Sequence, residues 1–232
     1  MSTLPPNACR LRVKYIKDGR LAYLGHLEVM GTVMRSVRRS GLPFEVGNGF
    51  AHRMRIQFSQ ALPVGASSKG EYFDLLLSEP TDPHAALEAL AQASPPALAP
   101  VDATILPRRM PALEAWANLS LWDVLIQQEG IDAHTFDVAV EGLRRVGSID
   151  FMRGTKPRHL ELGTTLVSWE AHDCADGVHV DLRTRSSERG ALRPQILVNA
   201  AIGVPALRVC RISQWHEEED GTLIDPMHEE SY

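Results

Sequence analysis

Two histidines near the N-terminus could do acid–base chemistry. His26 stands at the start of a segment with helical periodicity, and His52 lies within GNGFAHRMRIQF, residues 47–58. Imidazole titrates near neutral pH and can both accept and donate a proton, so the two rings could act as base and acid in metal-independent RNA cleavage. The alternative is structural: His26 hydrogen-bonds its own loop and supports the helix, and His52 is simply exposed.

The same region carries groups suited to binding an anion. Amides of a glycine loop can approach a phosphate closely, and arginine adds charge and paired hydrogen bonds. On a strand, Arg53 and Arg55 point to the same face. We therefore predict a substrate-binding surface made of Arg38, Arg39, Gly49, Phe50, Arg53 and Arg55. In the competing interpretation the arginines are only solvated, and the loop glycines only permit a turn.

The remaining reactive side chains predict no metal centre. Glu71 and Asp74 are three residues apart on an expected strand, which places them on opposite faces, so ion pairs with nearby arginines are favoured over an acid–base pair. Cys9, Cys174 and Cys210 are widely separated and form no CxxC pattern. We expect reduced, mostly structural thiols, no bound metal and no cofactor.

Charge is unevenly distributed along the 232 residues. Residues 1–70 hold eleven Lys and Arg against three Asp and Glu, a net +8, whereas residues 71–142 carry −10. Residues 143–216 carry +4 and residues 217–232 carry −7, which gives −5 for the chain. Such polarity suits an anionic ligand or an oppositely charged protein partner, although a solvated charged face explains it as well.

Composition places the chain among globular proteins. Hydrophobic residues make up 44%, which is enough for one sizeable core or two small ones. No apolar run approaches the roughly 20 residues that span a bilayer, and the N-terminal segment lacks the apolar region of a signal peptide. We expect a cytoplasmic protein with no membrane partner.

The first half of the chain predicts an alternation of strands and helices. RLRVKY (10–15) alternates apolar and basic residues, as a half-buried strand does. Apolar residues at helical spacing between Gly25 and Gly41 predict an amphipathic helix with a basic outer side. Asp82 and Pro83 predict the start of a second helix. The other extended segments expected in this half are 44–46, 53–58, 71–79 and 95–107.

The second half repeats this order. A strand is expected at 118–126, although its periodicity also fits a helix, and Asp132 would cap the helix that follows. The helix ends SVRRSGLPF (36–44) and GLRRVGSIDF (142–151) share two arginines before a glycine. The remaining elements are strands at 159–172, 177–185 and 207–215 and a short helix at 194–202.

These patterns predict an α+β protein of two tandem ferredoxin-like (βαββαβ) units with antiparallel sheets. The first unit, residues 8–107, holds the basic helix and the glycine loop, and the second spans residues 117–216. A linker near PRRMPALEA (107–115) joins them, and residues 217–232 are expected to form a mobile acidic tail.

The run from RVKYIKDGRLAYLGHLE to GEYFDLLL resembles the N-terminal portion of a bacterial family of uncharacterised proteins associated with radical SAM enzymes. The resemblance covers most of the chain, because Thr155–Lys156 and Arg193–Pro194 fit the weaker second-half pattern of that family. The chain departs from the pattern at Gly25, Glu28 and 51–53, so any ligand contacts that the family makes through the loop are in question here. The first-half matches are Leu24, His26, Leu27, Arg38, Arg39, Gly41, Leu42, Pro43, Gly49, Phe50, Phe58, Leu62, Pro63, Gly65, Glu71, Tyr72 and Asp74.

The resemblance implies a partner more than a reaction. Members of that family are encoded beside, or fused behind, a cobalamin-binding radical SAM protein. Such an enzyme binds its iron–sulfur cluster through three closely spaced cysteines, and this chain has no such motif. The radical chemistry would therefore belong to the partner.

Three functions follow as hypotheses. The first is an accessory module without catalytic activity of its own, which recognises an RNA-like or other anionic substrate and docks to the radical SAM protein. The second is a metal-independent endoribonuclease similar to the CRISPR repeat-processing ribonucleases, with His26 and His52 as the catalytic pair. The third is a protein-only interaction module. Aromatic residues make up only 6%, so any RNA binding would depend mainly on phosphates.

Overall fold

The computed structural model describes residues 8–48, 50–107, 110–187 and 190–228. The chain divides into two compact units. The first unit consists of Met1–Ala117 and Trp215–Tyr232, and the second consists of Asn118–Gln214. Both combine helices with sheets whose registered strand pairs are antiparallel. Within the described residues, no helix is long and apolar enough to cross a membrane.

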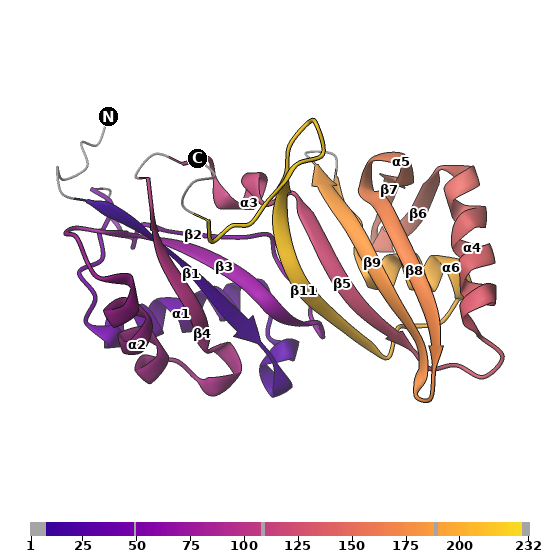
Figure 1. Ribbon diagram of the computed structural model, residues 1–232, viewed down its shortest axis with the longest axis horizontal. Coiled ribbons are helices and arrows are strands. Elements are labelled where there is room, and N and C mark those ends of the chain that lie inside the picture. Colours follow the sequence, from indigo (N-terminus) through magenta and orange to yellow (C-terminus); the bar gives the residue numbers. More distant parts are fainter. Residues whose placement is uncertain (1–7, 49, 108–109, 188–189, 229–232) are drawn as a thin grey trace. The chain divides into compact units, whose positions relative to one another are not determined.

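The main strands of the first unit follow the order β4-β1-β3-β2 (Figure 1). The pairing places Arg12 of β1 opposite Asp74 of β3 and Thr104 of β4. A short helical turn, η1 (Gly19–Tyr23), follows β1, and η2 (Pro96–Leu98) precedes β4. The main elements are β1 (Cys9–Lys17), α1 (His26–Ser40), β2 (Ile56–Phe58), β3 (Ser67–Leu77), α2 (Pro83–Ala93), β4 (Pro100–Leu106) and α3 (Leu113–Trp116).

Helices α1 and α2 cover one face of this sheet. Leu11 and Val13 of β1 pack with Val33 of α1 and Leu90 of α2 in one hydrophobic core. The predicted helix boundaries are confirmed. Helix α1 ends at Gly41, whose φ of 73° is left-handed and suits glycine. At the start of α2, Asp82 accepts a hydrogen bond from the Ala85 amide at 2.8 Å.

The opposite face of the same sheet is also covered, which the alternating pattern of β1 did not predict. Tyr72 packs there with Leu113, Trp116 and Ala117, and residues 224 and 227 lie against this cluster. Arg12 is consequently fully buried. The prediction of a half-buried strand is therefore wrong for this residue, because two segments distant in sequence lie over its face.

The acidic C-terminal segment contributes to that cover. Strand β12 (Leu223–Ile224) pairs with the end of β11 (Arg208–Glu217), and the carbonyl of Pro226 accepts a hydrogen bond from Arg12 at 3.1 Å. The part of the expected tail that the structure describes, residues 217–228, is therefore held against the first unit. Residues 229–232 lie outside the described residues.

In the second unit the strands follow the order β8-β9-β5-β11. Segment 118–126 is a strand, as predicted, and Asp132 caps α4 by accepting a hydrogen bond from the Thr135 amide at 2.7 Å. The elements are β5 (Leu119–Ile126), α4 (Ala133–Val146), β6 (Ser148–Arg153), β7 (Lys156–Glu161), α5 (Leu162–Thr165), β8 (Leu166–Cys174), β9 (Gly177–Ser187), β10 (Gly190–Ala191), α6 (Pro194–Ile202) and β11.

One prediction in this unit is wrong. Residues 159–172 were expected to form a single strand, but the chain turns twice within them. Strand β7 ends at Glu161, the short helix α5 follows, and β8 begins at Leu166. Strands β6 and β7 pair with each other and with no other described strand, so they form a separate hairpin that lies between α4 and β8 in the sequence (Figure 1).

Candidate functional site

His26 is the first residue of α1 and is held in a defined position. The side chain of Glu28 accepts a hydrogen bond from the Gly25 amide at 2.8 Å, which fixes the first turn. The His26 ring is partly buried and meets the Phe58 ring edge-on, with centroids 6.1 Å apart. Burial lowers the pKa of His26, and the charge of Lys17 lowers it further, against the opposite effect of Glu114. These surroundings favour the neutral form of the imidazole.

His52 lies in a different place from His26. It is exposed, and its φ of 40° is the only positive value at a non-glycine residue in the described chain. Among the described residues, no hydrogen bond, ion pair or ring contact joins His52 to His26, whose ring contacts Phe58 instead.

The predicted binding residues divide between the two sides of the first sheet. Arg38 and Arg39 are exposed on α1, on the helical side. Met54 belongs to the core under the helices, so the neighbouring Arg53 and Arg55 point to the opposite side of the extended chain. The four arginines therefore do not form one continuous surface.

The loop that precedes Arg53 presents an aromatic ring to solvent. Phe50 is fully exposed at the tip of an irregular hairpin in which the Gly47 amide donates to the Arg53 carbonyl at 2.8 Å. Gly49, the remaining predicted binding residue, lies outside the described residues. The loop can present the Phe50 ring to a ligand.

The ion pair expected for Asp74 is part of a buried network. Asp74 accepts hydrogen bonds from Arg12 Nε at 2.7 Å and Arg12 Nη2 at 2.9 Å, and from Arg10 Nη1 at 3.1 Å. The guanidinium of Arg12 also lies 5.2 Å from the centre of the Trp116 ring. The predicted arginine partner of Asp74 is confirmed. These contacts use Arg10 and Arg12 for packing and leave them unavailable to a ligand.

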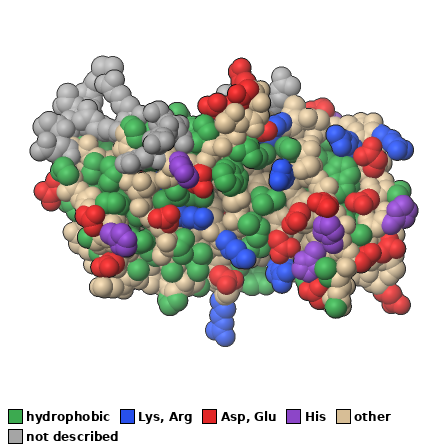
Figure 2. All heavy atoms as spheres, viewed as in Figure 1, with side chains coloured by type: hydrophobic (Ala, Val, Ile, Leu, Met, Phe, Trp, Pro, Cys, Tyr) green, Lys and Arg blue, Asp and Glu red, His purple; other side chains and the backbone are tan. Residues whose placement is uncertain are grey.

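In the second unit, the corresponding ion pairs lie nearer the surface than the Arg12–Asp74 pair. His179 lies between Asp176, at 3.0 Å, and Asp123, at 3.3 Å, and Asp123 also contacts Arg208 at 3.4 Å. Hydrogen bonds to Asp176 and then to Asp123 raise the pKa of His179. Figure 2 looks onto this face, where acidic side chains and histidines gather over β8 and β9.

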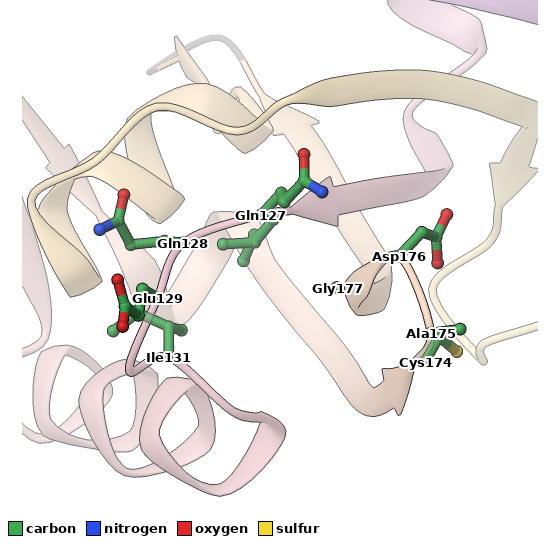
Figure 3. A pocket seen from close by; sticks show the side chains of 9 residues that line it. Gln127, Gln128, Glu129, Ile131, Cys174, Ala175, Asp176 and Gly177 are labelled. Carbon is green, nitrogen blue, oxygen red and sulfur yellow. The ribbon is translucent and has the colours of Figure 1, made fainter.

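A depression of about 330 Å³ lies beside this face, between the segment after β5 and the β8–β9 turn (Figure 3). Gln127, Gln128 and Glu129 line one side, and the exposed Cys174 lies on the other. Asp176 also lines it, but its carboxylate is engaged by His179. Across the described ranges, no group of three or more His, Cys, Asp or Glu could hold a metal ion. The depression therefore has the character of a polar surface hollow.

The arginines at the two corresponding helix ends differ in their surroundings. At the end of α4, Arg145 lies 3.9 Å from Glu141, and Arg144 lies over the Trp169 ring at 5.7 Å. At the end of α1, Arg38 reaches only the carbonyl of Met34, at 3.5 Å. Neither Arg38 nor Arg39 forms an ion pair within the part of the chain that the structure describes.

Comparison of the sequence with known protein families identifies one match. No curated protein matches the chain. A family model described as an uncharacterized protein conserved in bacteria (DUF2344) matches residues 10–194, from the start of β1 to the first residue of α6. That span includes the sheet of the first unit, both arginine-ended helices and the β6–β7 hairpin. The chain belongs to the DUF2344 family of bacterial proteins.

Proposed function

We propose that the protein is a non-catalytic binding module that recognises an RNA-like anionic substrate and docks to a cobalamin-binding radical SAM protein, which supplies the chemistry. One observation carries the proposal. Two similar helix ends each expose a pair of arginines. The α4 pair contacts a carboxylate and an aromatic ring, whereas within the described residues Arg38 and Arg39 of α1 contact neither and Arg38 reaches only a backbone carbonyl.

The position of these arginines on α1 supports phosphate binding. Val29, Val33 and Val37 hold the inner side of α1 in the core. Arg35, Arg38 and Arg39 are exposed outside it, so ligand access needs no rearrangement of the core. Guanidinium groups bind phosphate oxygens through charge and paired hydrogen bonds, and the binding does not depend on base sequence. A favourable interaction of Arg39 with the C-terminal end of the helix dipole is compatible with this role.

The different surroundings of His26 and His52 support the non-catalytic form of the proposal over the ribonuclease alternative. The neutral, partly buried His26 beside Phe58 fits the structural interpretation of that residue, in which it supports the start of α1. His52, Phe50 and Arg53 remain candidates for ligand contact from the exposed loop. Arg55 belongs to the same side of the chain as Arg53.

The strand orders support a finer description of the architecture as two ferredoxin-like units. In each unit the first strand, β1 or β5, lies next to the third long strand, β3 or β9, with the last strand on its other side. This is the order expected when two strand–helix–strand crossovers interlock. The β6–β7 hairpin is then an insertion in the second unit.

Docking to the partner is proposed to use the acidic C-terminal segment. Glu218, Glu219 and Asp220 are exposed at the turn between β11 and β12. The Glu218 amide donates to the Thr222 carbonyl at 2.9 Å, so the turn is ordered and presents its charges from a fixed position. Such an arrangement suits a basic surface on the partner.

The test is RNA binding by the full chain as a function of salt. We expect a fluorescein-labelled 20-nucleotide RNA to bind at 50 mM salt and to dissociate as the salt rises. The Arg38→Gln/Arg39→Gln variant should lose about tenfold in affinity, and its salt slope should fall by about 1.4, since each lost phosphate contact removes about 0.7.

The matched control is Arg144→Gln/Arg145→Gln, which makes the same charge change at the corresponding helix end. We expect it to bind RNA within about twofold of the wild type. Absence of RNA binding by the wild-type protein at 50 mM salt would refute the RNA-like substrate and favour the protein-only alternative. Equal losses in the two variants would refute the assignment to α1.

A further inference from the structure

The β6–β7 hairpin of the second unit has two faces of different chemistry, and its register defines them. Ile149 pairs with Leu160, and both are buried. Phe151 pairs with Arg158, and Arg153 pairs with Lys156. Because alternate residues of a strand share a face, these three pairs lie on the same side of the hairpin. On that side, the residues farthest from the turn are buried, and those next to the turn are exposed and basic.

The acidic residues of the hairpin lie on its other face. Asp150 pairs with His159 and contacts its Nδ1 at 2.7 Å, and Glu161 contacts Nε2 of the same ring at 2.9 Å. Both carboxylates are therefore engaged by His159, on the side opposite Arg153 and Arg158. The hairpin does not neutralise its own basic face.

A further arginine adjoins this face. Arg193 is the residue before α6, and α6 packs against β6. Its side chain is partly buried, and within the described residues its guanidinium makes no hydrogen bond or ion pair. Burial lowers the pKa of Arg193, and the positive charge of Arg153 on β6 lowers it further.

The exposed cations on the hairpin are likewise without acidic partners. Arg153, Lys156 and Arg158 are exposed, and none forms an ion pair with a carboxylate in the described part of the chain. Phe151 lies among them and is only partly buried. Arg158 lies opposite Phe151 and Arg153 lies opposite Lys156, so like charges stand side by side on this face, and an anion bound between them would relieve their repulsion.

We propose that Arg153, Lys156, Arg158 and Arg193, with Phe151, form a second ligand surface that binds the phosphodiester backbone of single-stranded RNA. The cations would hold successive phosphates, and the Phe151 ring would stack against a base. This inference rests on the proposed function, because it names a second surface for the same class of ligand, and it assigns a binding role to the second unit.

The test compares three variants of the full chain for binding of fluorescein-labelled oligouridine, 20 nucleotides long, at 50 mM salt. Arg153→Gln/Lys156→Gln/Arg158→Gln removes three exposed charges from the basic face. We expect its affinity to fall by tenfold or more and its salt slope by about 2. Phe151→Leu, which retains an apolar side chain, should weaken binding by about fivefold.

Arg144→Gln/Arg145→Gln/Arg183→Gln is the control, because it removes three other exposed charges of the same unit. We expect it to bind within about twofold of the wild type, and near-UV circular dichroism should show that all variants remain folded. If the hairpin variant also binds like the wild type, the second surface is refuted while the proposed function stands. If the wild type binds no oligouridine, both are refuted.

Inorganic phosphate distinguishes a polymer site from a site for a small anion. At constant ionic strength, 10 mM phosphate should displace less than a tenth of the bound oligouridine, because the RNA engages several cations at once. Displacement of half or more would overturn the assignment to RNA and identify a phosphate site.

Discussion

Both units place ionic groups on the sheet face that lies away from their main helices, but only the first unit covers them. The side chains of Arg12 and Asp74 are 0% and 1% exposed, whereas those of Asp123, His179 and Arg208 are 27%, 28% and 50% exposed. Water screens the second set and is excluded from the first. Similar ion pairs should therefore contribute very differently to stability in the two units.

The largest expected effect is the difference in stability lost when an ion pair is broken in the first unit and in the second unit. Asp74→Ala removes the carboxylate that accepts two hydrogen bonds from the buried Arg12 and should lower the free energy of unfolding by about 3–5 kcal/mol. Asp123→Ala removes a partly exposed partner and should cost about 0–1 kcal/mol. Urea unfolding followed by tryptophan fluorescence measures both.

A double replacement tests whether charge isolation causes the loss in the first unit. Arg12→Met/Asp74→Leu removes both charges and keeps apolar volume, so we expect it to be more stable than Asp74→Ala alone. If the double variant is as unstable as the single variant, packing rather than the unpaired charge determines the loss. If Asp123→Ala is as damaging as Asp74→Ala, the contrast between the units is wrong.

Removal of a helix cap should lower the stability of both units by similar amounts. It therefore provides a reference for the unequal losses expected at the ion pairs. Asp82→Ala removes the acceptor for the Ala85 amide and should cost about 1 kcal/mol. Asp132→Ala removes the equivalent acceptor for the Thr135 amide and should also lower the urea midpoint. Asp82→Ser and Asp132→Ser, which retain a capping oxygen, should recover most of each loss. A loss confined to one unit would contradict the equivalence of the two helix starts.

Local sequence signals predicted much of each unit. Asp82 and Asp132 marked helix starts because a side-chain oxygen satisfies an amide at that position, and Gly41 marked a helix end because it adopts a left-handed conformation. These signals depend on neighbouring residues alone. They hold whatever the rest of the chain does.

Burial on the second face of the first sheet could not be predicted in the same way. The alternation around Arg12 shows which residues share a face, but exposure depends on what lies over that face. Here the cover comes from α3 and from Pro226, the latter 214 residues away from Arg12 in sequence. The placement of Arg38 and Arg53 on different sides of the first sheet could not be predicted either, because a count of charged residues does not show on which side of a sheet each residue lies.

The hairpin at residues 148–161 was missed for a related reason. The residues after Arg158 combine strand-forming side chains with a short helical turn at Leu162–Thr165, which has no sequence signal as strong as a capping aspartate. The one available signal was Gly154, whose φ of 62° marks the turn of the hairpin. Its basic face becomes visible only when the register pairs Arg153 with Lys156.

The smallest expected effect is a difference in the sign of the pH dependence of the two units. Burial lowers the pKa of His26 below its ordinary 6.5, so the stability that depends on its neutral form is present above pH 6.5 and is lost as the pH falls through the lowered pKa. Hydrogen bonds to carboxylates raise the pKa of His179 above 6.5, so its contribution is present below pH 6.5 and is lost as the pH rises through the raised pKa.

NMR titration of the imidazole resonances between pH 4.5 and 8.5 tests this difference directly. We expect the His26 midpoint to lie below 6.5 and the His179 midpoint above it. His159, held between Asp150 and Glu161 on the hairpin, should also titrate above 6.5. Asp176→Asn should move the His179 midpoint downward and leave His26 unchanged. A His26 midpoint above 6.5 would mean that a carboxylate such as Glu114, rather than burial beside Phe58, dominates its surroundings.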